Sequence, residues 1–149
     1  MNQLSYQAVN LAEKAQLLFE MDVKTFTREF DFPARNVEDT IEYLKDCKIY
    51  LAYINNEVVG LFAYQELANH VVEVKQLIVL KKFQGHGYGQ ELLKQLFTLS
   101  AKKIRLVTHP LNNAAIITYL KSGFQLIGWK DNYYGDEQPR LLLEKKLDN

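Results

Sequence analysis

The sequence predicts an α/β fold in a single domain over residues 1–149, with a mixed, mostly antiparallel twisted sheet of about six to seven strands and about four flanking helices. Two patterns lead to this prediction. The pair Asn55-Asn56 tolerates the positive φ of a tight hairpin and stands between two segments rich in β-branched and aromatic residues. Farther along, a strand–helix–strand pattern over residues 71–108 predicts a βαβ unit with two parallel strands.

The first half of the chain alternates strand and helix patterns. Residues 4–9 alternate in polarity and predict a short strand, and residues 12–26 carry a ragged apolar stripe at helical spacing. A second helix is expected over residues 37–47. The two strands of the hairpin follow at residues 48–54 and 57–64.

The second half begins with a turn near Asn69. A long strand is predicted over residues 71–80, a helix over 88–99 and a further strand over 104–108. Pro110 ends that strand. Two last strands that close the sheet are expected at residues 124–130 and 140–146.

Between Pro110 and the last strands the sequence predicts one more helix. Asn112 or Asn113 can cap its start, and it runs to Lys121. Gly123 stands where a left-handed cap after the helix belongs.

Composition excludes several functional classes. The chain is 48% hydrophobic and 24% charged with a net charge of zero, as in ordinary soluble proteins, and it lacks the basic excess that nucleic-acid binding favours. No window approaches the roughly 18 apolar residues of a membrane span, and the N-terminus lacks a signal pattern, so we expect no membrane association and a cytoplasmic location. The single cysteine, Cys47, is interpreted as a packing residue, and we expect no metal.

A glycine-rich loop is the strongest functional signal. Residues 84–89 read Gln-Gly-His-Gly-Tyr-Gly between the strand at 71–80 and the helix at 88–99. Glycine lets backbone N–H groups turn toward one point, and a helix start adds unpaired donors and a positive dipole end. The loop therefore predicts an anion site, most simply for a pyrophosphate.

Dinucleotide-binding folds, P-loops and tight turns share these ingredients. A P-loop needs Lys-Ser or Lys-Thr after its glycines, which this chain lacks. An NAD-binding fold needs an early first strand and an acidic residue after the second. Here the loop lies past mid-chain, and Arg105, Thr108 and His109 end the following strand, which leaves an NAD-dependent oxidoreductase a remote alternative.

Two motifs resemble those of the GNAT N-acetyltransferase superfamily. Gln84, Gly87 and Gly89 match its acetyl-CoA motif, Gln/Arg-x-x-Gly-x-Gly/Ala, between a strand and a helix. Downstream, the family pattern Asn-x-x-Ala-x-x-x-Tyr-x-Lys-x-Gly-Phe is matched by Asn112, Ala115, Tyr119, Lys121, Gly123 and Phe124. The order of predicted elements is also similar across essentially the whole chain.

The resemblance implies acetyl-CoA as co-substrate and a splayed central pair of parallel strands. The pantetheine arm would pair with the backbone of Leu77, Ile78 and Val79, and the pyrophosphate would accept hydrogen bonds from N–H groups of Gln84, Gly85, His86, Gly87, Tyr88 and Gly89. We expect the His86 side chain to face solvent. Asn112, Ala115 and Tyr119 follow one another by three and four residues, so they share a helix face that would line the thiol end.

The chemistry requires a neutral amine and a stabilised thiolate. An alkylammonium of pKa about 10.4 is neutral roughly once in 2,500 molecules at pH 7, which corresponds to about 4.6 kcal/mol. By the resemblance Glu73 is a candidate base, although it could instead form an exposed pair with Lys75, and a water chain could serve. Tyr119 would protonate or orient the departing thiolate; the alternative is a packing role.

The acceptor is not identified by the sequence. The resemblance puts it between residues 26–36 and 131–139, where Phe30, Tyr133 and Tyr134 stand near the carboxylates Asp31, Asp136 and Glu137. Aromatic rings beside carboxylates suit a cationic amine, and ordinary loop packing would look the same.

The sequence thus predicts acetyl transfer to a primary amine of a small molecule or a peptide. A protein lysine or N-terminal acetyltransferase and a non-catalytic acyl-CoA sensor are the alternatives. A homodimer is also kept open, because exposed apolar residues of the last strand, Leu141, Leu142 and Leu143, could pair.

Overall fold

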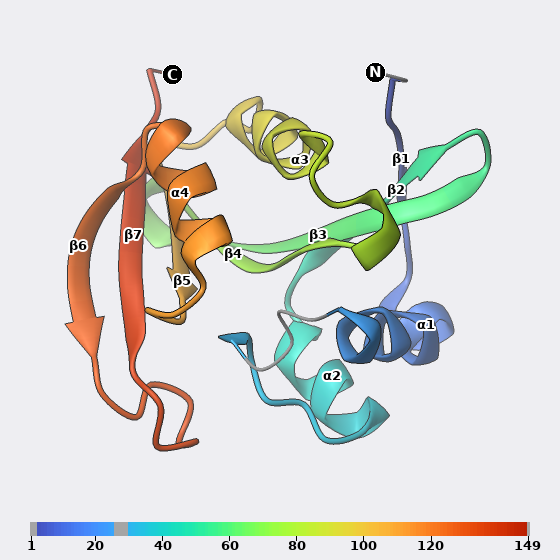
Figure 1. Cartoon of the computed structure of the whole chain (residues 1–149), viewed down its shortest axis with the longest axis horizontal. Coiled ribbons are helices and arrows are strands. Elements are labelled where there is room, and N and C mark those ends of the chain that lie inside the picture. Colours follow the sequence, from blue (N-terminus) through green and yellow to red (C-terminus); the bar gives the residue numbers. More distant parts are fainter. Residues whose placement is uncertain (1–2, 26–29, 149) are drawn as a thin grey trace.

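The computed structural model describes residues 3–25 and 30–148, and within them seven strands form one sheet in the order β1-β2-β3-β4-β5-β7-β6 (Figure 1). The strands are β1 (Ser5–Ala8), β2 (Lys48–Ile54), β3 (Glu57–Leu67), β4 (Val71–Val79), β5 (Lys103–Thr108), β6 (Gln125–Lys130) and β7 (Arg140–Lys146). The α-helices are α1 (Leu11–Lys24), α2 (Val37–Leu44), α3 (Tyr88–Phe97) and α4 (Asn113–Lys121). Among the strands of the described residues, only β4 and β5 pair in parallel, so the predicted fold class is confirmed.

The helices cover both faces of the sheet. Figure 1 shows α1 and α2 on one side of β3 and β4, and α3 with α4 on the other. Each face of the sheet has its own hydrophobic core. Leu18 of α1 and Leu44 of α2 belong to one core, and Leu92 of α3 and Tyr119 of α4 belong to the other. None of the helices in the described residues is long and apolar enough to cross a membrane.

Local signals place most element ends correctly. Asn55 and Asn56 have φ of 49° and 67°, which confirms the tight hairpin. Gly123, at φ 92°, follows α4 as predicted. Three predicted ends are wrong by two or more residues: α2 stops at Leu44 instead of residue 47, β3 extends to Leu67 instead of residue 64, and α3 stops at Phe97 instead of residue 99. The predicted end of the first helix, Phe26, lies outside the described residues.

Two pairing details shift the ends of α2 and β3. The N–H of Cys47 turns back to donate to the carbonyl of Leu44 at 3.0 Å, so the chain leaves the helix early to enter β2. The additional residues of β3 pair with the start of β4. Tertiary pairing thus overrides the local pattern at these positions.

The central parallel pair is short. β4 and β5 are paired only where Val71–Glu73 lie beside Lys103–Arg105. Beyond that point β4 continues along β3 and β5 along β7, so the two strands separate. The splayed pair expected from the resemblance is therefore present, and it opens the middle of the sheet.

A bulge in β4 changes which side chains face each layer. Its register with β3 passes from Gln76 directly to Val74 and skips Lys75. Val74 and Leu77 consequently both pack on the α3 side, whereas Ile78 packs on the α1 and α2 side.

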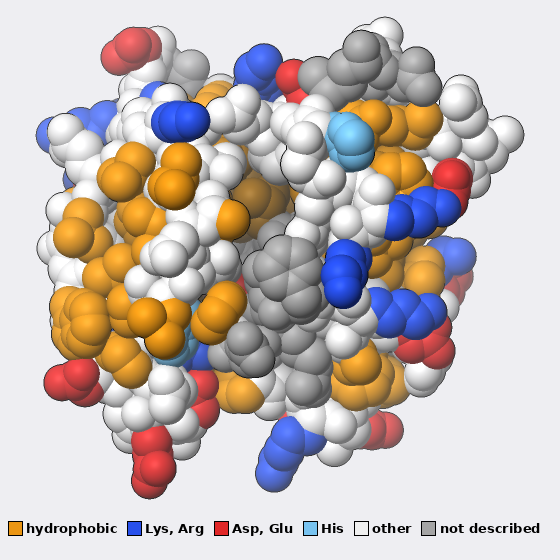
Figure 2. All heavy atoms as spheres, viewed as in Figure 1, with side chains coloured by type: hydrophobic (Ala, Val, Ile, Leu, Met, Phe, Trp, Pro, Cys, Tyr) orange, Lys and Arg blue, Asp and Glu red, His pale blue; other side chains and the backbone are white. Residues whose placement is uncertain are grey.

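The last strands correct one expectation. β7 lies between β5 and β6 with both edges paired, Leu143 is buried, and Leu141 and Leu142 are half-buried. These leucines therefore cannot form the exposed pairing surface that we expected for a homodimer. Exposed large apolar side chains lie instead on or beside α4 and on the edge strand β6, where Figure 2 shows apolar atoms gathered: Leu111, Ile117, Leu120, Leu126, Ile127 and Trp129.

Candidate active site

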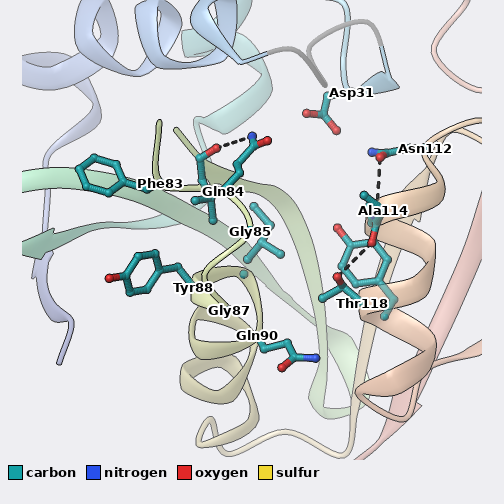
Figure 3. Close-up of a pocket in the computed structure, with 15 residues that line it drawn as sticks. Asp31, Phe83, Gln84, Gly85, Gly87, Tyr88, Gln90, Asn112, Ala114 and Thr118 are labelled. Atoms are coloured by element: carbon teal, nitrogen blue, oxygen red, sulfur yellow. Dashed lines mark hydrogen bonds between the residues drawn. The ribbon is translucent and has the colours of Figure 1, made fainter. Parts of the chain in front are cut away.

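A cavity of about 440 Å³ opens where β4 and β5 separate. It joins the glycine-rich loop, the end of β4, one face of α4 and a side chain from the segment between α1 and α2 (Figure 3). Its lining residues are Asp31, Leu77, Val79, Phe83, Gln84, Gly85, Gly87, Tyr88, Gly89, Gln90, Asn112, Ala114, Ala115, Thr118 and Tyr119. The two predicted motifs, far apart in sequence, therefore meet at one site.

The glycine-rich loop presents free backbone donors. Gly85 and Gly87 have φ of 81° and 84°, and Gly87 is the N-cap of α3. Within the described chain, the N–H groups from Gly85 to Gly89 donate to no backbone carbonyl. A Cβ added at any of the three glycines would meet no described atom within 4 Å. The loop has the donors and open space that a pyrophosphate requires.

Gln84 differs from the other loop residues. Its N–H already donates to the carbonyl of Lys81 at 3.3 Å, so the predicted donor cluster starts at Gly85 instead. Its side-chain Nε2 donates to the Val79 carbonyl at 2.8 Å, which ties the loop to the end of β4. The His86 side chain is exposed, as expected, but His86 is absent from the lining of the cavity, whereas Tyr88 lines it.

The end of β4 contributes one wall of the cavity. Leu77 and Val79 line it. Ile78 does not, because its side chain is buried in the core on the opposite face with Leu61. Of the three residues expected to pair with a pantetheine arm, Ile78 can therefore offer only its backbone, along the side of β4 that β5 leaves unpaired.

The start of α4 forms the opposite wall. The Asn112 side-chain Oδ1 accepts the Ala115 N–H at 3.4 Å, which caps the helix as predicted. Asn112, Ala115 and Tyr119 all line the cavity, so the predicted shared face is present, and Ala114 and Thr118 extend it.

Tyr119 is buried and its ring lies 5.8 Å from that of Phe124. Burial raises the pKa of its hydroxyl well above the ordinary value, and the charge of Asp31 raises it further. The hydroxyl is therefore a stable hydrogen-bond donor at neutral pH.

Glu73 lies on the opposite side of the sheet from α3 and is absent from the lining of the cavity. Its carboxylate is 3.5 Å from Lys75 Nζ, and both side chains are half-buried. Lys75 Nζ in turn lies 4.9 Å from the centre of the Tyr43 ring. The pair with Lys75 that the sequence offered as an alternative is thus present, and it is partly shielded from solvent.

An aromatic cluster stands beside the cavity, formed by Phe32, Tyr43, Tyr133 and Tyr134. Phe32 stacks on Tyr43 at 4.0 Å between ring centroids and meets Tyr134 edge-on at 5.4 Å. The Tyr43 and Tyr134 hydroxyls are 3.3 Å apart, and Tyr133 packs edge-on against Tyr134. The segments after α1 and between β6 and β7 therefore meet here, as the acceptor prediction requires.

The three residues predicted to bind the acceptor do not line the cavity. Tyr133 and Tyr134 belong to the aromatic cluster, and the Phe30 ring packs 5.0 Å from that of His109. His109 is itself held in place: its Nδ1 accepts the Leu111 N–H at 3.1 Å, so its Nε2 carries the proton that is donated to Gln138 Oε1 at 3.0 Å.

A buried arginine joins these segments. Arg140 at the start of β7 is fully buried, and its guanidinium donates to the main-chain carbonyls of Pro139 and Asp31 and to the carboxylate of Asp136. It also lies 5.0 Å from the centre of the Tyr134 ring. Asp136 is thereby occupied as a counter-ion, which makes it unavailable as the acceptor contact that the sequence offered.

Asp31 combines burial with access to the cavity. The pKa of its carboxyl is raised to about 7, chiefly by loss of solvent and further by the charge of Asp22 on α1, with Arg140 opposing the increase. Figure 3 shows Asp31 and Asn112 at the end of the cavity away from Phe83 and Tyr88.

Four lining residues were not singled out by the sequence: Phe83, Gln90, Ala114 and Thr118. Asp31 was named only as one of several carboxylates in the acceptor segments. Ala114 and Thr118 could have been found, because they are four residues apart and directly precede Ala115 and Tyr119 of the predicted helix face. Asp31 stands in an irregular segment, where no periodicity distinguishes it from the other acidic residues of the two loops. In the described part of the chain, no group of three or more His, Cys, Asp or Glu residues is placed to hold a metal ion.

Comparison with known proteins identifies the family to which this fold belongs. A sequence model of the acetyltransferase (GNAT) family matches residues 15–124. Because that match covers most of the chain, the protein belongs to the GNAT acetyltransferase family.

Solved structures show the same fold. A GNAT family acetyltransferase from Elizabethkingia anophelis with acetyl-CoA bound is 20% identical with a TM-score of 0.76, covering 99% of this chain and 100% of that one. The ribosomal-protein-S18-alanine N-acetyltransferase of Escherichia coli is 13% identical at a TM-score of 0.79, with 99% and 96% covered. A spermidine N-acetyltransferase chimera from Vibrio cholerae and hSSAT is 17% identical with a TM-score of 0.78, covering 97% of this chain and 96% of that one.

Proposed function

We propose that this protein binds acetyl-CoA in the cavity and transfers the acetyl group to a primary amine by direct attack in a ternary complex. In that step the amine nitrogen bonds to the thioester carbon, the carbon–sulfur bond breaks, and its electron pair leaves with sulfur. The observation that carries the proposal is that one cavity connects an anion-binding loop to the helix face with Tyr119.

The cavity suggests how acetyl-CoA would lie. Its pyrophosphate would accept hydrogen bonds from the N–H groups of Gly85 to Gly89, and its pantetheine arm would follow the unpaired side of β4 at Leu77 and Val79. The thioester would then reach α4 beside Asn112, Ala115 and Tyr119. The acetyl-CoA complex of the Elizabethkingia protein, which has the same fold, supports this assignment.

Tyr119 would stabilise the thiolate by a hydrogen bond. A phenol of ordinary pKa, about 10, transfers its proton to a thiolate of pKa about 8.5 at a cost of about 2 kcal/mol. Burial of Tyr119 increases that cost, because it raises the pKa of the hydroxyl. Of the two roles expected for Tyr119, orientation and hydrogen bonding are therefore favoured over full protonation.

Glu73 remains a predicted base. Its charge contributes to the raised pKa values of Tyr43 and Tyr133, so it acts on the aromatic cluster. Lys75 Nζ lies 3.5 Å from its carboxylate, so an incoming amine would have to displace this ion-pair partner.

The aromatic cluster favours a small amine. The rings of Phe32, Tyr43 and Tyr134 pack against one another, an arrangement that suits a closed pocket for a small molecule better than an open groove for a peptide. Relatives of this fold include enzymes named for spermidine and for a protein alanine, both of which present an amine. A protein N-acetyltransferase is therefore the second candidate.

The test is a thiol-release assay with acetyl-CoA and a panel of polyamines, amino acids, aminoglycosides and short peptides. We expect release that depends on one class of acceptor. Binding of CoA in calorimetry without release for any acceptor would favour an acyl-CoA sensor. Failure to bind CoA would overturn the proposal as a whole.

A further inference from the structure

We infer that the carboxylate of Asp31 receives the proton from the attacking amine and selects an acceptor that carries its amine as a cation in solution. The inference rests on the proposed acetyl transfer and adds to it a catalytic residue that the two family motifs do not contain. Its basis is the position of Asp31 at the junction of the cavity and the aromatic cluster.

The lining of the cavity contains one acid among the described residues, and it is Asp31. In Figure 3 its carboxylate is directed into the space between the loop and α4, at the same end as Asn112. Tyr119, the residue proposed to hold the departing sulfur, lines the same cavity. A group placed there lies on the side from which an acceptor would approach the thioester.

The backbone of Asp31 is held in place by Arg140. Arg140 Nη2 donates to the main-chain carbonyl of Asp31 at 3.0 Å, and its ionic partner is the carboxylate of Asp136 at 2.9 Å. In residues 3–25 and 30–148, no hydrogen bond or ion pair engages the Asp31 side chain. Among the residues that the structure describes, the carboxylate is thus positioned by its neighbours without a direct contact that neutralises it.

The charge of Asp31 acts both on the cavity and on the aromatic cluster. Its charge raises the pKa of Tyr119 on the cavity side and contributes to that of Tyr134 in the aromatic cluster. Glu73, by contrast, affects Tyr43, Tyr133 and Cys47, and it is not among the groups that act on Tyr119. Of the two carboxylates, Asp31 is therefore the one close to the reacting end of the donor.

The protonation behaviour of Asp31 suits a base at neutral pH. Burial and Asp22 raise its pKa to about 7, with Arg140 opposing them, and the facing hydroxyls of Tyr119 and Tyr134 remain protonated. An ordinary aspartate, with a pKa near 3.9, would be a much weaker proton acceptor. A half-buried anion also attracts an ammonium ion, which releases one proton to solvent before its nitrogen can attack.

The step balances as follows. After the bound ammonium has released one proton to solvent, the neutral amine nitrogen attacks the thioester carbon and gains a positive charge, and the Asp31 carboxylate removes one further proton from that nitrogen. The carbon–sulfur pair leaves as thiolate, which Tyr119 hydrogen-bonds. The proton on Asp31 then passes to the thiolate, so that an amide and free CoA thiol are formed and both side chains are restored.

The test compares Asp31→Asn and Glu73→Gln with the wild type and with Asp46→Asn, an exposed carboxylate outside the site. The probe acceptors are spermidine, an L-amino acid and an alanine-terminated peptide, and the readouts are kcat/KM against pH and calorimetric affinity for CoA. For the wild type we expect kcat/KM to fall as pH decreases through about 7. Asp31→Asn should remove this dependence and lower kcat by about 100-fold or more, with CoA affinity within about threefold of the wild type.

A second readout does not need turnover. The Asp31 carboxyl carbon, assigned by its absence from the Asp31→Asn spectrum, should titrate near pH 7 in carbon NMR. Titration near pH 4 would overturn the inference, as would an Asp31→Asn enzyme that keeps the wild-type rate and pH profile while Glu73→Gln loses them. A wild-type protein that turns over none of the acceptors would count against acetyl transfer itself.

Discussion

Arg140 Nη2 donates a hydrogen bond of 3.0 Å to the main-chain carbonyl of Asp31, which lies 109 residues earlier in the chain. This contact fastens the segment after α1 to the first residue of β7, next to the cavity. Because the arginine is fully buried, its donors cannot be replaced by solvent without rearrangement. Asp31 therefore depends on a strand at the far end of the sequence for its position.

Replacing Arg140 with alanine should lower the free energy of unfolding by about 3 kcal/mol, because Asp136 then loses its partner in a mostly buried place. Urea denaturation measures the change. The matched control is Arg105→Ala. Arg105 forms an ion pair with Glu144, but its side chain is 47% exposed, so the free energy of unfolding should fall by no more than about 1 kcal/mol. Equal losses in the two variants would contradict the role of Arg140.

Gly87→Ala should weaken CoA binding at least about tenfold in calorimetry, because a Cβ would enter the space where the pyrophosphate is proposed to lie. The variant also incurs about 1–2 kcal/mol of backbone strain, since φ is 84°. Gly135→Ala controls for that strain, because Gly135 has φ 78° and lies outside the cavity. If both variants bind CoA like the wild type, the loop is not the phosphate site.

Tyr119→Phe should reduce kcat by about 10- to 100-fold, the value of a hydrogen bond to a charged group, with CoA affinity nearly unchanged. Single-turnover kinetics with saturating acetyl-CoA measures the effect on the chemical step. Tyr64→Phe is the control, since Tyr64 is also a buried tyrosine of the same core but does not line the cavity. An unaltered rate in Tyr119→Phe would remove its hydroxyl from the mechanism.

The raised pKa of Asp31 also predicts how stability depends on pH. The folded protein holds this proton up to about pH 7, whereas the unfolded chain loses it near 3.8, so the contribution to stability decreases as pH rises across that interval. A rise from 3.8 to about 7 corresponds to at most about 4 kcal/mol. Asp31→Asn should therefore become increasingly stable relative to the wild type between about pH 4 and 8 in urea denaturation. A difference that stays constant with pH would show that the carboxylate is not strained by burial.

Much of this architecture follows from local sequence signals. The asparagines at the β2–β3 hairpin, the cap at Asn112 and the glycine after α4 each specify a backbone conformation, and the structure shows all three. The face shared by Asn112, Ala115 and Tyr119 follows from helix geometry alone. For such features the information lies within a few residues.

Features that depend on tertiary pairing were less accessible. The bulge that skips Lys75 in β4 reverses the facing of Ile78, and no local signal marks it. The position of β7 inside the sheet, which covers Leu143, is likewise a matter of topology. Asp31 differs from the other acidic residues by its contact with Arg140 and by its burial, and both exist only in the folded chain.

The central claim is that an amine attacks the thioester of acetyl-CoA held in this cavity. Quantifying thiol release and acetylated amine in the same reaction, by a colorimetric assay and mass spectrometry, tests that claim most directly. We predict one acetylated nitrogen for each thiol released, and loss of both products together in Gly87→Ala at low acetyl-CoA concentration. Thiol release without acetylated amine would indicate hydrolysis of the thioester and would contradict the proposed transfer.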